Sequence, residues 1–258
     1  NVTTGQVYAT VIERERKGEY LGKTVQPIPH VTDEIKKRVK EVANNTKTDF
    51  VLIEVGGVVG DYENILFLEA ARQMRFDGEK VVFVHVAYLP FLGSFGELKS
   101  KPVQHSTKEL LSLGIQPDFI ICRSDYPIDE VRKDKVAMFC NVTKEDIISN
   151  PNLENIYELP LYFEKQEFGN KILKKFYIEP KSSDLKKWKQ FVDNLSDGKK
   201  TVKVGIIGKY FDIGEYKLPD AYVSVIEAIR HAAANNQVKI EISWVDSKDF
   251  EKDNSKLS

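Results

Sequence analysis

One short stretch of the chain gathers carboxylates and glycines at the end of an apolar run. The segment VLIEVGGVVGDYEN, residues 51–64, passes from apolar residues into a turn rich in acids and glycines: Glu54, Gly56, Gly57, Gly60, Asp61 and Glu63. A carboxylate in an apolar strand is rarely left unpaired, and a magnesium ion facing a phosphate would be a natural partner for Glu54. The glycines allow a tight turn and close approach to a ligand. The alternative is a plain strand–helix turn, in which Asp61, or Asp61 with Glu63, caps the next helix.

A second stretch places lysines ahead of an expected helix. In ELKSKPVQHSTKELL, residues 97–111, Lys99 and Lys101 precede a proline, and a helix is expected from about Gln104. Two ammonium groups before a helix N-terminus form an anion site, because unpaired backbone N–H groups and the positive end of the helix dipole lie there too. A solvated basic loop is the alternative for this stretch. A solvated helix face is the alternative for Lys135, which is one of three basic residues within four positions.

Several familiar sites are absent from the sequence. GGVVG does not fit the dinucleotide pattern GxGxxG, and no Lys-Ser/Thr pair follows to make a Walker A loop. Three histidines lack metal-ligand spacing and cysteine partners, which argues against zinc: His30, His85 and His105. His85, inside VVFVHVA, is expected to be a hydrogen-bonded core histidine. Cys122 and Cys140 lie beside apolar residues and are expected to be reduced core thiols.

Composition indicates a globular protein acting on small molecules. The 258 residues are 41% hydrophobic and 30% charged, with a net charge of −1, so no overall field favours nucleic acid or membrane. No apolar run approaches the roughly 20 residues that span a bilayer. No secretory leader is visible, and a cytoplasmic protein is expected. The chain starts with NVTTGQVY and ends with the polar SKDFEKDNSKLS, and a piece of a longer protein is expected.

The apolar pattern predicts alternating strands and helices. Strands, nearly continuous in apolar residues, are expected at 50–55, 80–87, 118–122, 201–208 and 238–245. One helix is expected to begin with Thr32 as its cap and to present Ile35, Val39 and Val42 on one face. Further helices are expected at 63–75, 104–113 and 126–139. Strands alternating with helices predict an α/β fold with a mostly parallel sheet.

A domain boundary is expected near 181–200. The segment KSSDLKKWKQFVDNLSDGKK carries a short amphipathic helix, whose apolar residues are Leu185, Trp188, Phe191, Val192 and Leu195. A new strand, TVKVGIIGKY, and a helix, LPDAYVSVIEAIRHAA, follow it. We therefore predict one domain over 1–180, a linker over 181–200 and the beginning of a second α/β domain over 201–258.

Motifs spread over nearly the whole chain resemble the CTP synthases. In order along the chain they are NVTTGQVY, ERKGEYLGKTVQPIPH, EVGGVVGDYEN, LKSKPVQHSTKELLSLGIQPDFIICRSD, KVAMFCNV and VGIIGKY…LPDAYVSVIEAIRHA. The resemblance implies that 1–180 is the C-terminal part of a synthetase domain with a Rossmann-like sheet of the P-loop amidoligase type. It implies that 201–258 begins a class I glutaminase domain.

The resemblance also implies an activity. Members of the family make CTP from UTP, ATP and glutamine. ATP phosphorylates the uracil O4, and ammonia that reaches the site through a tunnel displaces the phosphate. Mg²⁺ is required, GTP activates glutamine hydrolysis, and CTP inhibits at the UTP site. The resemblance implies assembly as tetramers, with filaments as a further form of assembly.

Roles carry over to matching positions of this sequence. Glu54 matches a magnesium ligand. The residues that match UTP- or CTP-contacting positions are Asp61, Tyr62, Glu63, Lys99, Ser100, Lys101, Pro102, Val103, Gln104 and Lys135, with Gln26 a candidate for uracil recognition. Pro151, Asn152 and Leu153 align with a segment near the adenine of ATP, although their side chains depart from the family pattern. The residues that match the region coupling GTP to ammonia use are Glu19, Leu21 and Gly22, and His30 matches the ammonia exit.

Parts of the family pattern lie outside this sequence. The glycine-rich phosphate loop would precede residue 1, and the glutaminase cysteine with its His–Glu partners would follow residue 258, so this chain alone is expected to make no CTP. Three alternatives stay open: another P-loop amidoligase acting on a carboxylate, a non-catalytic member kept for assembly or filaments, and a NAD-dependent oxidoreductase. The last lacks its fingerprint.

Overall fold

The computed structural model describes residues 1–93, 96–196, 200–208, 212–213, 216–217 and 222–247. The chain divides into two compact units. The first unit comprises 1–154 and 162–180, and the second comprises 155–161 and 181–258. The segment 155–161 therefore belongs to the second unit although the sequence around it belongs to the first.

A parallel sheet forms the centre of the first unit. Its strands are β1 (Val84–Tyr88), β4 (Phe119–Ser124) and β5 (Ile147–Pro151), in the order β1-β4-β5. Val84 pairs with Phe119, and Ile120 pairs with Ile147. The short strands β2 (Phe91–Leu92) and β3 (Glu97–Leu98) form an antiparallel hairpin after β1. The predicted α/β class with parallel strands is confirmed.

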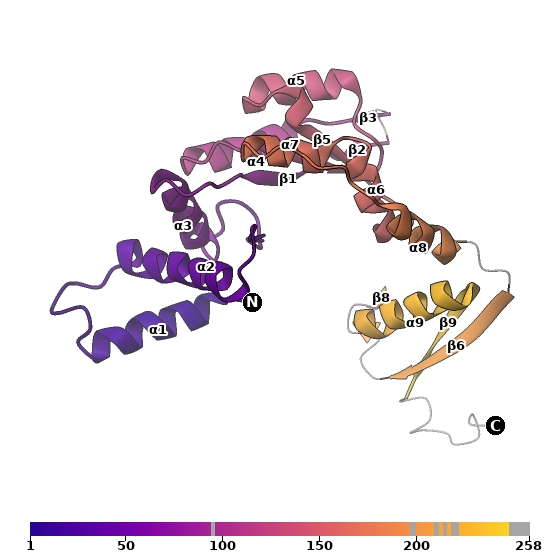
Figure 1. The fold of residues 1–258 in the computed structure, drawn as a ribbon, viewed down its shortest axis with the longest axis horizontal. Helices are drawn as coiled ribbons and strands as arrows, with labels where there is room; N and C mark the ends of the chain where they lie inside the picture. The colour runs from indigo at the N-terminus through magenta and orange to yellow at the C-terminus, as the bar shows by residue number, and fades with distance from the viewer. Residues whose placement is uncertain (94–95, 197–199, 209–211, 214–215, 218–221, 248–258) are drawn as a thin grey trace. The chain divides into compact units, whose positions relative to one another are not determined.

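Helices on both faces explain why the first four residues of β4, Phe119–Cys122, are all apolar (Figure 1). Ile120 and Cys122 lie in a core that also contains residues of α4 (Lys101–Ser112) and α5 (Glu130–Cys140). Phe119 and Ile121 lie in a second core with Phe168 of α7 (Phe168–Lys175). Alternate residues of a strand point to opposite faces, so a strand covered on both faces must be apolar at every position.

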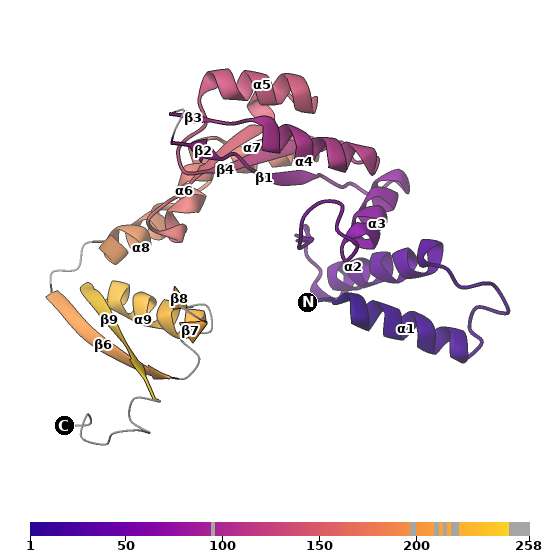
Figure 2. The same cartoon turned by 180° about the vertical axis from the view of Figure 1, so that it is seen from behind.

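Three helices form a separate core in the first unit. They are α1 (Thr4–Arg16), α2 (Thr32–Thr46) and α3 (Ile65–Phe76), packed around Val7, Val11, Val31, Ile35 and Ala70. Figure 2 shows α1 and α2 running side by side. Sequence reasoning did not predict α1, whose start is fixed by a capping box between Thr3 and Gln6.

The predicted cap of α2 is wrong. Val31 occupies the N-cap position, because the kinked segment η1 (Pro27–Val31), which has non-helical backbone angles at Ile28, runs directly into α2. Thr32 is fully buried, and its hydroxyl donates to the carbonyl of Pro29 at 2.9 Å. Val42 is exposed, so the apolar face of α2 ends before it.

The predicted strand over 50–55 is also wrong, because these residues adopt no regular structure. Leu52 is 97% exposed and Ile53 is 53% exposed. A strand forms only where a neighbour accepts and donates its backbone hydrogen bonds. Among the described residues, no strand pairs with this segment.

Two predicted helix starts move for local reasons. α4 begins at Lys101 rather than near 104, since Pro102 fits the first helical turn. α5 begins at Glu130 rather than at 126, since the Asp129 carboxylate accepts from the backbone N–H of Arg132 at 2.8 Å and caps the helix there. The remaining elements of this unit are η2 (Lys144–Asp146) and α6 (Leu159–Glu164), which begins in the segment assigned to the second unit.

The second unit contains a two-stranded parallel sheet. β6 (Lys200–Gly208) pairs with β9 (Val238–Asp246), and α9 (Val223–Asn236) connects them. The other elements are η3 (Ile156–Glu158), α8 (Lys186–Ser196), β7 (Asp212–Ile213) and β8 (Tyr216–Lys217). The start of the predicted helix, 218–221, and the polar tail, 248–258, lie outside the described residues.

Candidate functional site

The carboxyl ends of the three parallel strands define one edge of the sheet. β1 ends at Tyr88, β4 at Ser124 and β5 at Pro151. The segments that follow remain neighbours: Leu89 N–H donates to the carbonyl of Arg123 at 2.7 Å, and Asn152 N–H donates to that of Ser124 at 2.8 Å. Ligands of open parallel sheets bind at this edge.

The start of α4 follows β1 and the β2–β3 hairpin at this edge. Ser100 precedes the helix without capping it, and its hydroxyl instead accepts from the Gln104 side-chain amide at 3.1 Å. Uncapped first-turn N–H groups and the positive end of the helix dipole suit an anion. Val103 is fully buried in the core, so at that position the backbone, and not the side chain, faces any ligand.

The predicted lysines surround the start of α4. Lys99 is paired with Glu97, which also pairs with Arg132 of α5. The hydrogen bond from Lys99 is the largest cause that lowers the pKa of Glu97. The Lys101 ammonium lies 5.3 Å from the centre of the Phe139 ring on α5. Lys135 is four residues before Phe139 and therefore lies on the same face of α5.

The segment expected near adenine lies at the same edge. Pro151 is buried at the end of β5. Asn152 is exposed, and its side-chain amide donates to the Asp125 carboxylate at 2.8 Å. Leu153 is half-buried. The structure thus brings the segment 151–153 and the lysine-rich start of α4 to one edge of one sheet.

The glycine-rich turn is held by Asp61 and Asn64. The Asp61 carboxylate accepts from the backbone N–H of Val58 at 2.9 Å. The Asn64 side chain donates to the carbonyls of Gly56 at 3.1 Å and Val58 at 2.7 Å. The predicted caps of the next helix are therefore wrong: Asn64 precedes α3, and no side chain caps it. Asn64 is buried, and sequence reasoning missed it because asparagine in a loop gives no distinctive signal.

Gly57 shows why glycine is needed in this turn. Its φ is +90°, and an added Cβ would lie 3.1 Å from the Asn64 side-chain nitrogen and 3.3 Å from an Asp61 carboxylate oxygen. Glu54, Tyr62 and Glu63 are exposed beside this turn. The expectation that Glu54 sits inside a buried strand is wrong, because the strand itself does not form.

The residues expected to couple ammonia use lie in the loop between α1 and α2. Glu19 accepts from Arg14 at 2.9 Å, while Leu21 is 88% exposed and Gly22 has a φ of +80°. The backbone N–H of Gln26 donates to His30 Nδ1 at 3.0 Å. These residues form a local cluster around α1 and α2.

The expected core residues are confirmed. His85 is buried and shares a hydrogen bond of 2.8 Å with the Ser106 hydroxyl, and burial lowers its pKa. Burial raises the pKa of Cys122 to about 12 and also raises that of Cys140. His105, by contrast, is exposed on α4.

A cavity of about 490 Å³ lies at the opposite edge of the sheet, and none of the predicted site residues lines it. Its lining includes Arg75, which pairs with Asp118 at 2.7 Å, together with Lys80, Lys174 and Lys175. α3 and α7 both end near it. Helix C-termini carry partial negative charge, which the basic side chains offset, so this cavity is less suited to a polyphosphate than the start of α4.

Comparison with known proteins identifies relatives over the whole chain. Residues 1–178 match the family model described as CTP synthase N-terminus. CTP synthases of Pyrococcus abyssi and Sulfolobus acidocaldarius are each 48% identical over 259 residues, covering 100% of this chain and 47% and 48% of the relatives. The CTP synthase of Methanococcus maripaludis is 46% identical over 256 residues, 98% of this chain and 47% of the relative. The chain spans about half the length of the curated relatives it matches.

Proposed function

The chain belongs to the CTP synthase family, and on that premise we propose that the full-length protein aminates UTP to CTP. ATP would phosphorylate the uracil O4, and ammonia released from glutamine would then attack C4 and displace the phosphate. This chain alone would be inactive, because it spans about half the length of its relatives.

The start of α4 is the observation that carries the proposal. An uncapped helix N-terminus, the Lys101 ammonium and Lys135 on the adjoining face of α5 lie at the carboxyl edge of a parallel sheet. A nucleoside triphosphate carries several negative charges, and backbone N–H groups with lysines are the usual partners of phosphate. We assign the triphosphate of UTP, or of inhibitory CTP, to the segment 99–104 together with Lys135.

The remaining contacts follow from the neighbouring segments. Pro151, Asn152 and Leu153, at the same edge, would contact the adenine of ATP. Asp61, Tyr62 and Glu63 would contact bound CTP, and Gln26 the uracil ring. Phosphoryl transfer depends on positioning and charge neutralisation more than on covalent help from the protein, so this chain would mainly align the uracil O4 with the transferred phosphoryl group.

Glu54 is better suited to bind a magnesium ion that is also bound by phosphate oxygens than to form part of a site made of protein ligands alone. Among the described residues, no group of three or more histidine, cysteine or acidic side chains could enclose a metal ion. Mg²⁺ often binds one or two carboxylates and completes its shell with phosphate oxygens and water. Glu54 is exposed, and Gly56 beside it leaves space next to the carboxylate. Bound Mg²⁺ would neutralise phosphate charge, and Glu54 would hold it.

Regulation and assembly complete the proposal. The loop with Glu19, Leu21, Gly22 and His30 would couple glutamine hydrolysis, activated by GTP, to ammonia use. Residues 1–180 would belong to the synthetase domain, 181–200 to the linker and 201–258 to the beginning of the glutaminase domain. The full-length protein would assemble as a cytoplasmic homotetramer, which could extend into filaments. None of the described helices is long and apolar enough to span a membrane.

CTP formation by the full-length protein tests the proposal. UTP, ATP, Mg²⁺ and an ammonium salt are supplied, because ammonium bypasses the glutaminase. We expect CTP from the wild type and a loss of about 100-fold in Glu54→Gln, the size seen when a charge-stabilising group is removed. Glu109→Gln, which alters an exposed glutamate on α4, is the control and should keep full activity. A wild type that makes no CTP refutes the proposed reaction, and an active Glu54→Gln refutes the metal assignment.

A further inference from the structure

A buried carboxylate lies where the α1–α2 hairpin opens into the loop of residues 17–31. The Glu34 side chain is 4% exposed. Burying a carboxylate is costly unless cations compensate it, and two arginines do so. Arg38 Nε donates to Oε1 at 2.8 Å, and Arg14 Nη1 lies 3.7 Å from Oε2. Glu34 is also in the first turn of α2, where the helix dipole favours negative charge.

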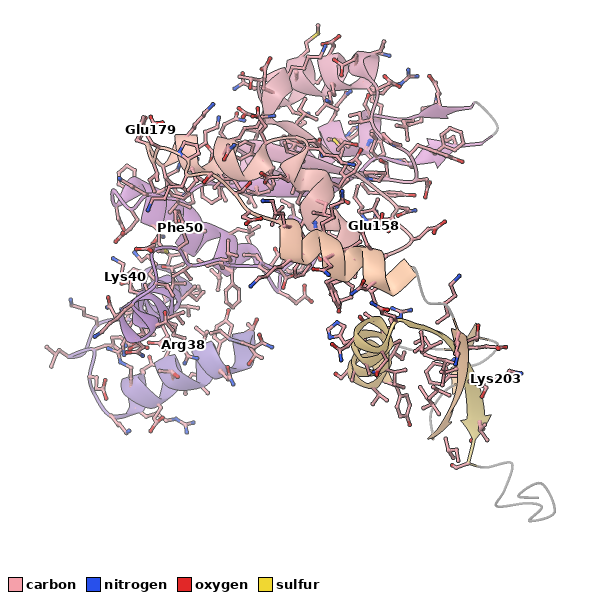
Figure 3. The ribbon with its side chains drawn as sticks, turned by 45° about the vertical axis from the view of Figure 1, so that its right-hand side comes forward. Arg38, Lys40, Phe50, Glu158, Glu179 and Lys203 are labelled. Atoms are coloured by element: carbon pink, nitrogen blue, oxygen red, sulfur yellow. The ribbon has the colours of Figure 1, made fainter. Side chains whose placement is uncertain are left out.

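The two arginines have different further contacts. Arg38, labelled in Figure 3, also donates to the Thr10 hydroxyl at 2.8 Å and to the carbonyl of Gln6 at 3.3 Å, so it joins α2 to α1. Arg14 reaches the loop instead: its Nε donates to Glu19 at 2.9 Å, and its guanidinium carbon lies 5.1 Å from the centre of the Tyr20 ring. Arg14 therefore connects Glu34 to the first residues of the loop.

Tyr20 connects the two ends of the loop. Its ring packs against the core shared by α1, α2 and α3. It meets the His30 ring edge-to-face with 4.7 Å between the ring centres. His30 in turn accepts from the backbone N–H of Gln26 at 3.0 Å. A single chain of contacts thus runs from the Glu34 carboxylate through Arg14 and Tyr20 to His30.

Of the two contacts between Glu34 and arginines, the ion pair with Arg14 is the longer and more easily changed. Glu34 Oε2 is buried and accepts no hydrogen bond, and its ion pair with Arg14 is nearly 1 Å longer than the bond between Oε1 and Arg38. Neutralising Glu34 would leave Arg38 with its contacts to α1. It would leave Arg14 held by the loop residues Glu19 and Tyr20, which are themselves at the surface or half-buried. The loop would lose its electrostatic attachment to α2.

We propose that Glu34 is a positioning residue, which through Arg14 fixes the loop of residues 17–31. The loop carries Glu19, Leu21, Gly22 and His30, and this inference rests on the proposed function in assigning that loop to the coupling of glutamine hydrolysis to ammonia use. Glu34 itself touches no substrate. Its charge keeps the loop in the arrangement that lets ammonia from glutamine reach the synthetase site.

The test compares Glu34→Gln with Glu41→Gln in the full-length protein. Glu41 is an exposed glutamate on the same helix, paired with Lys37 at 3.6 Å. The first measurement is the ratio of glutamine-dependent to ammonium-dependent CTP formation. The second, independent of activity, is the rate of tryptic cleavage after Lys17 and Lys23 in the folded protein, followed by mass spectrometry.

We expect Glu34→Gln to lower the ratio about tenfold, within the usual range of coupling between sites, and to accelerate cleavage of the loop about tenfold. Ammonium-dependent turnover should stay within about twofold of wild type, and Glu41→Gln should match wild type in both measurements. If Glu34→Gln does not fold, Glu34→Asp, which keeps the charge but draws it away from Arg14, replaces it with the same expectations.

Several results would overturn the inference. An unchanged ratio of glutamine-dependent to ammonium-dependent CTP formation in Glu34→Gln would overturn it. A lower ratio without faster cleavage would also overturn it, because the loss of coupling would then not come from a loosened loop. A wild type that makes no CTP from ammonium refutes the proposed function instead. In that case cleavage alone decides whether Glu34 holds the loop: equal rates in Glu34→Gln and Glu41→Gln refute it, and faster cleavage supports it.

Discussion

Removing the Asn64 side chain should loosen the glycine-rich turn by a predictable amount. Its amide donates two hydrogen bonds, to the carbonyls of Gly56 and Val58, and each such bond contributes about 1 kcal/mol. Its buried side-chain oxygen accepts no hydrogen bond, so losing that oxygen returns part of this free energy. Asn64→Ala should therefore destabilise the turn by about 1–2 kcal/mol. Asn64→Asp should cost more, because a carboxylate would face two carbonyl oxygens.

Native-state hydrogen exchange measures this local change directly. The amides of Val58, Asp61, Asn64 and Ile65 are all hydrogen-bonded within the turn. In Asn64→Ala they should exchange about 5- to 30-fold faster than in wild type, which corresponds to the loss of about 1–2 kcal/mol. Asn44→Ala, at an exposed position of α2, is the matched control and should leave these rates unchanged. Unchanged exchange in Asn64→Ala would refute the reasoning that the side chain holds the turn.

Three further predictions concern buried or hydrogen-bonded groups. Burial lowers the pKa of His85 below its ordinary 6.5, so as the pH falls the unfolded chain binds a proton before the folded protein does. The contribution of His85 to the free energy of unfolding is therefore complete above pH 6.5. Below that pH it is lost at up to about 1.4 kcal/mol per pH unit. Urea titrations should show this slope, and His85→Gln should reduce it. Cys122 and Cys140 are buried with raised pKa values, so a thiol reagent should label both in urea and neither in the folded protein; rapid native labelling would contradict the core assignment. The Tyr157 hydroxyl donates to the Glu227 carboxylate at 2.8 Å and lies 2.6 Å from His231 Nε2, both on α9, so Tyr157→Phe should cost about 1.5–3 kcal/mol and speed amide exchange in α9; unchanged exchange would show that these contacts do not stabilise the helix.

Sequence periodicity predicted some elements of the fold and missed others, among them α1 and β5. β4 was predicted within a few residues, because burial on both faces makes its positions from Phe119 to Cys122 apolar. The same pattern at 50–55 predicted a strand that does not form. Composition reports that a segment suits a sheet, but a strand also needs a neighbour, and no described strand pairs with Leu52 or Ile53. Thr32 does not cap α2, because its hydroxyl donates to the carbonyl of Pro29 in the preceding kinked segment η1.

The candidate site was predicted as a set of segments but not as an arrangement. The segment 151–153 could not be placed at the sheet edge from the sequence, because the strand before it, β5, was not among the predicted strands. Sequence spacing does not encode the tertiary contacts of this site. Lys101 contacts Phe139, and Glu97 joins Lys99 to Arg132. Glu34 gave no signal either, because a glutamate in the first turn of a helix is usually solvated.

The start of α4 is proposed to bind the triphosphate of a pyrimidine nucleotide, and a UTP-binding measurement is the sharpest test of this assignment. Calorimetric titration of the full-length protein would compare wild type with Lys101→Gln and with Lys108→Gln, an exposed lysine later on the same helix. A hydrogen bond to a charged group contributes about 1.5–3 kcal/mol. Lys101→Gln should therefore weaken binding at least about tenfold, and Lys108→Gln should leave it unchanged. Equal affinities for the two variants would contradict the account.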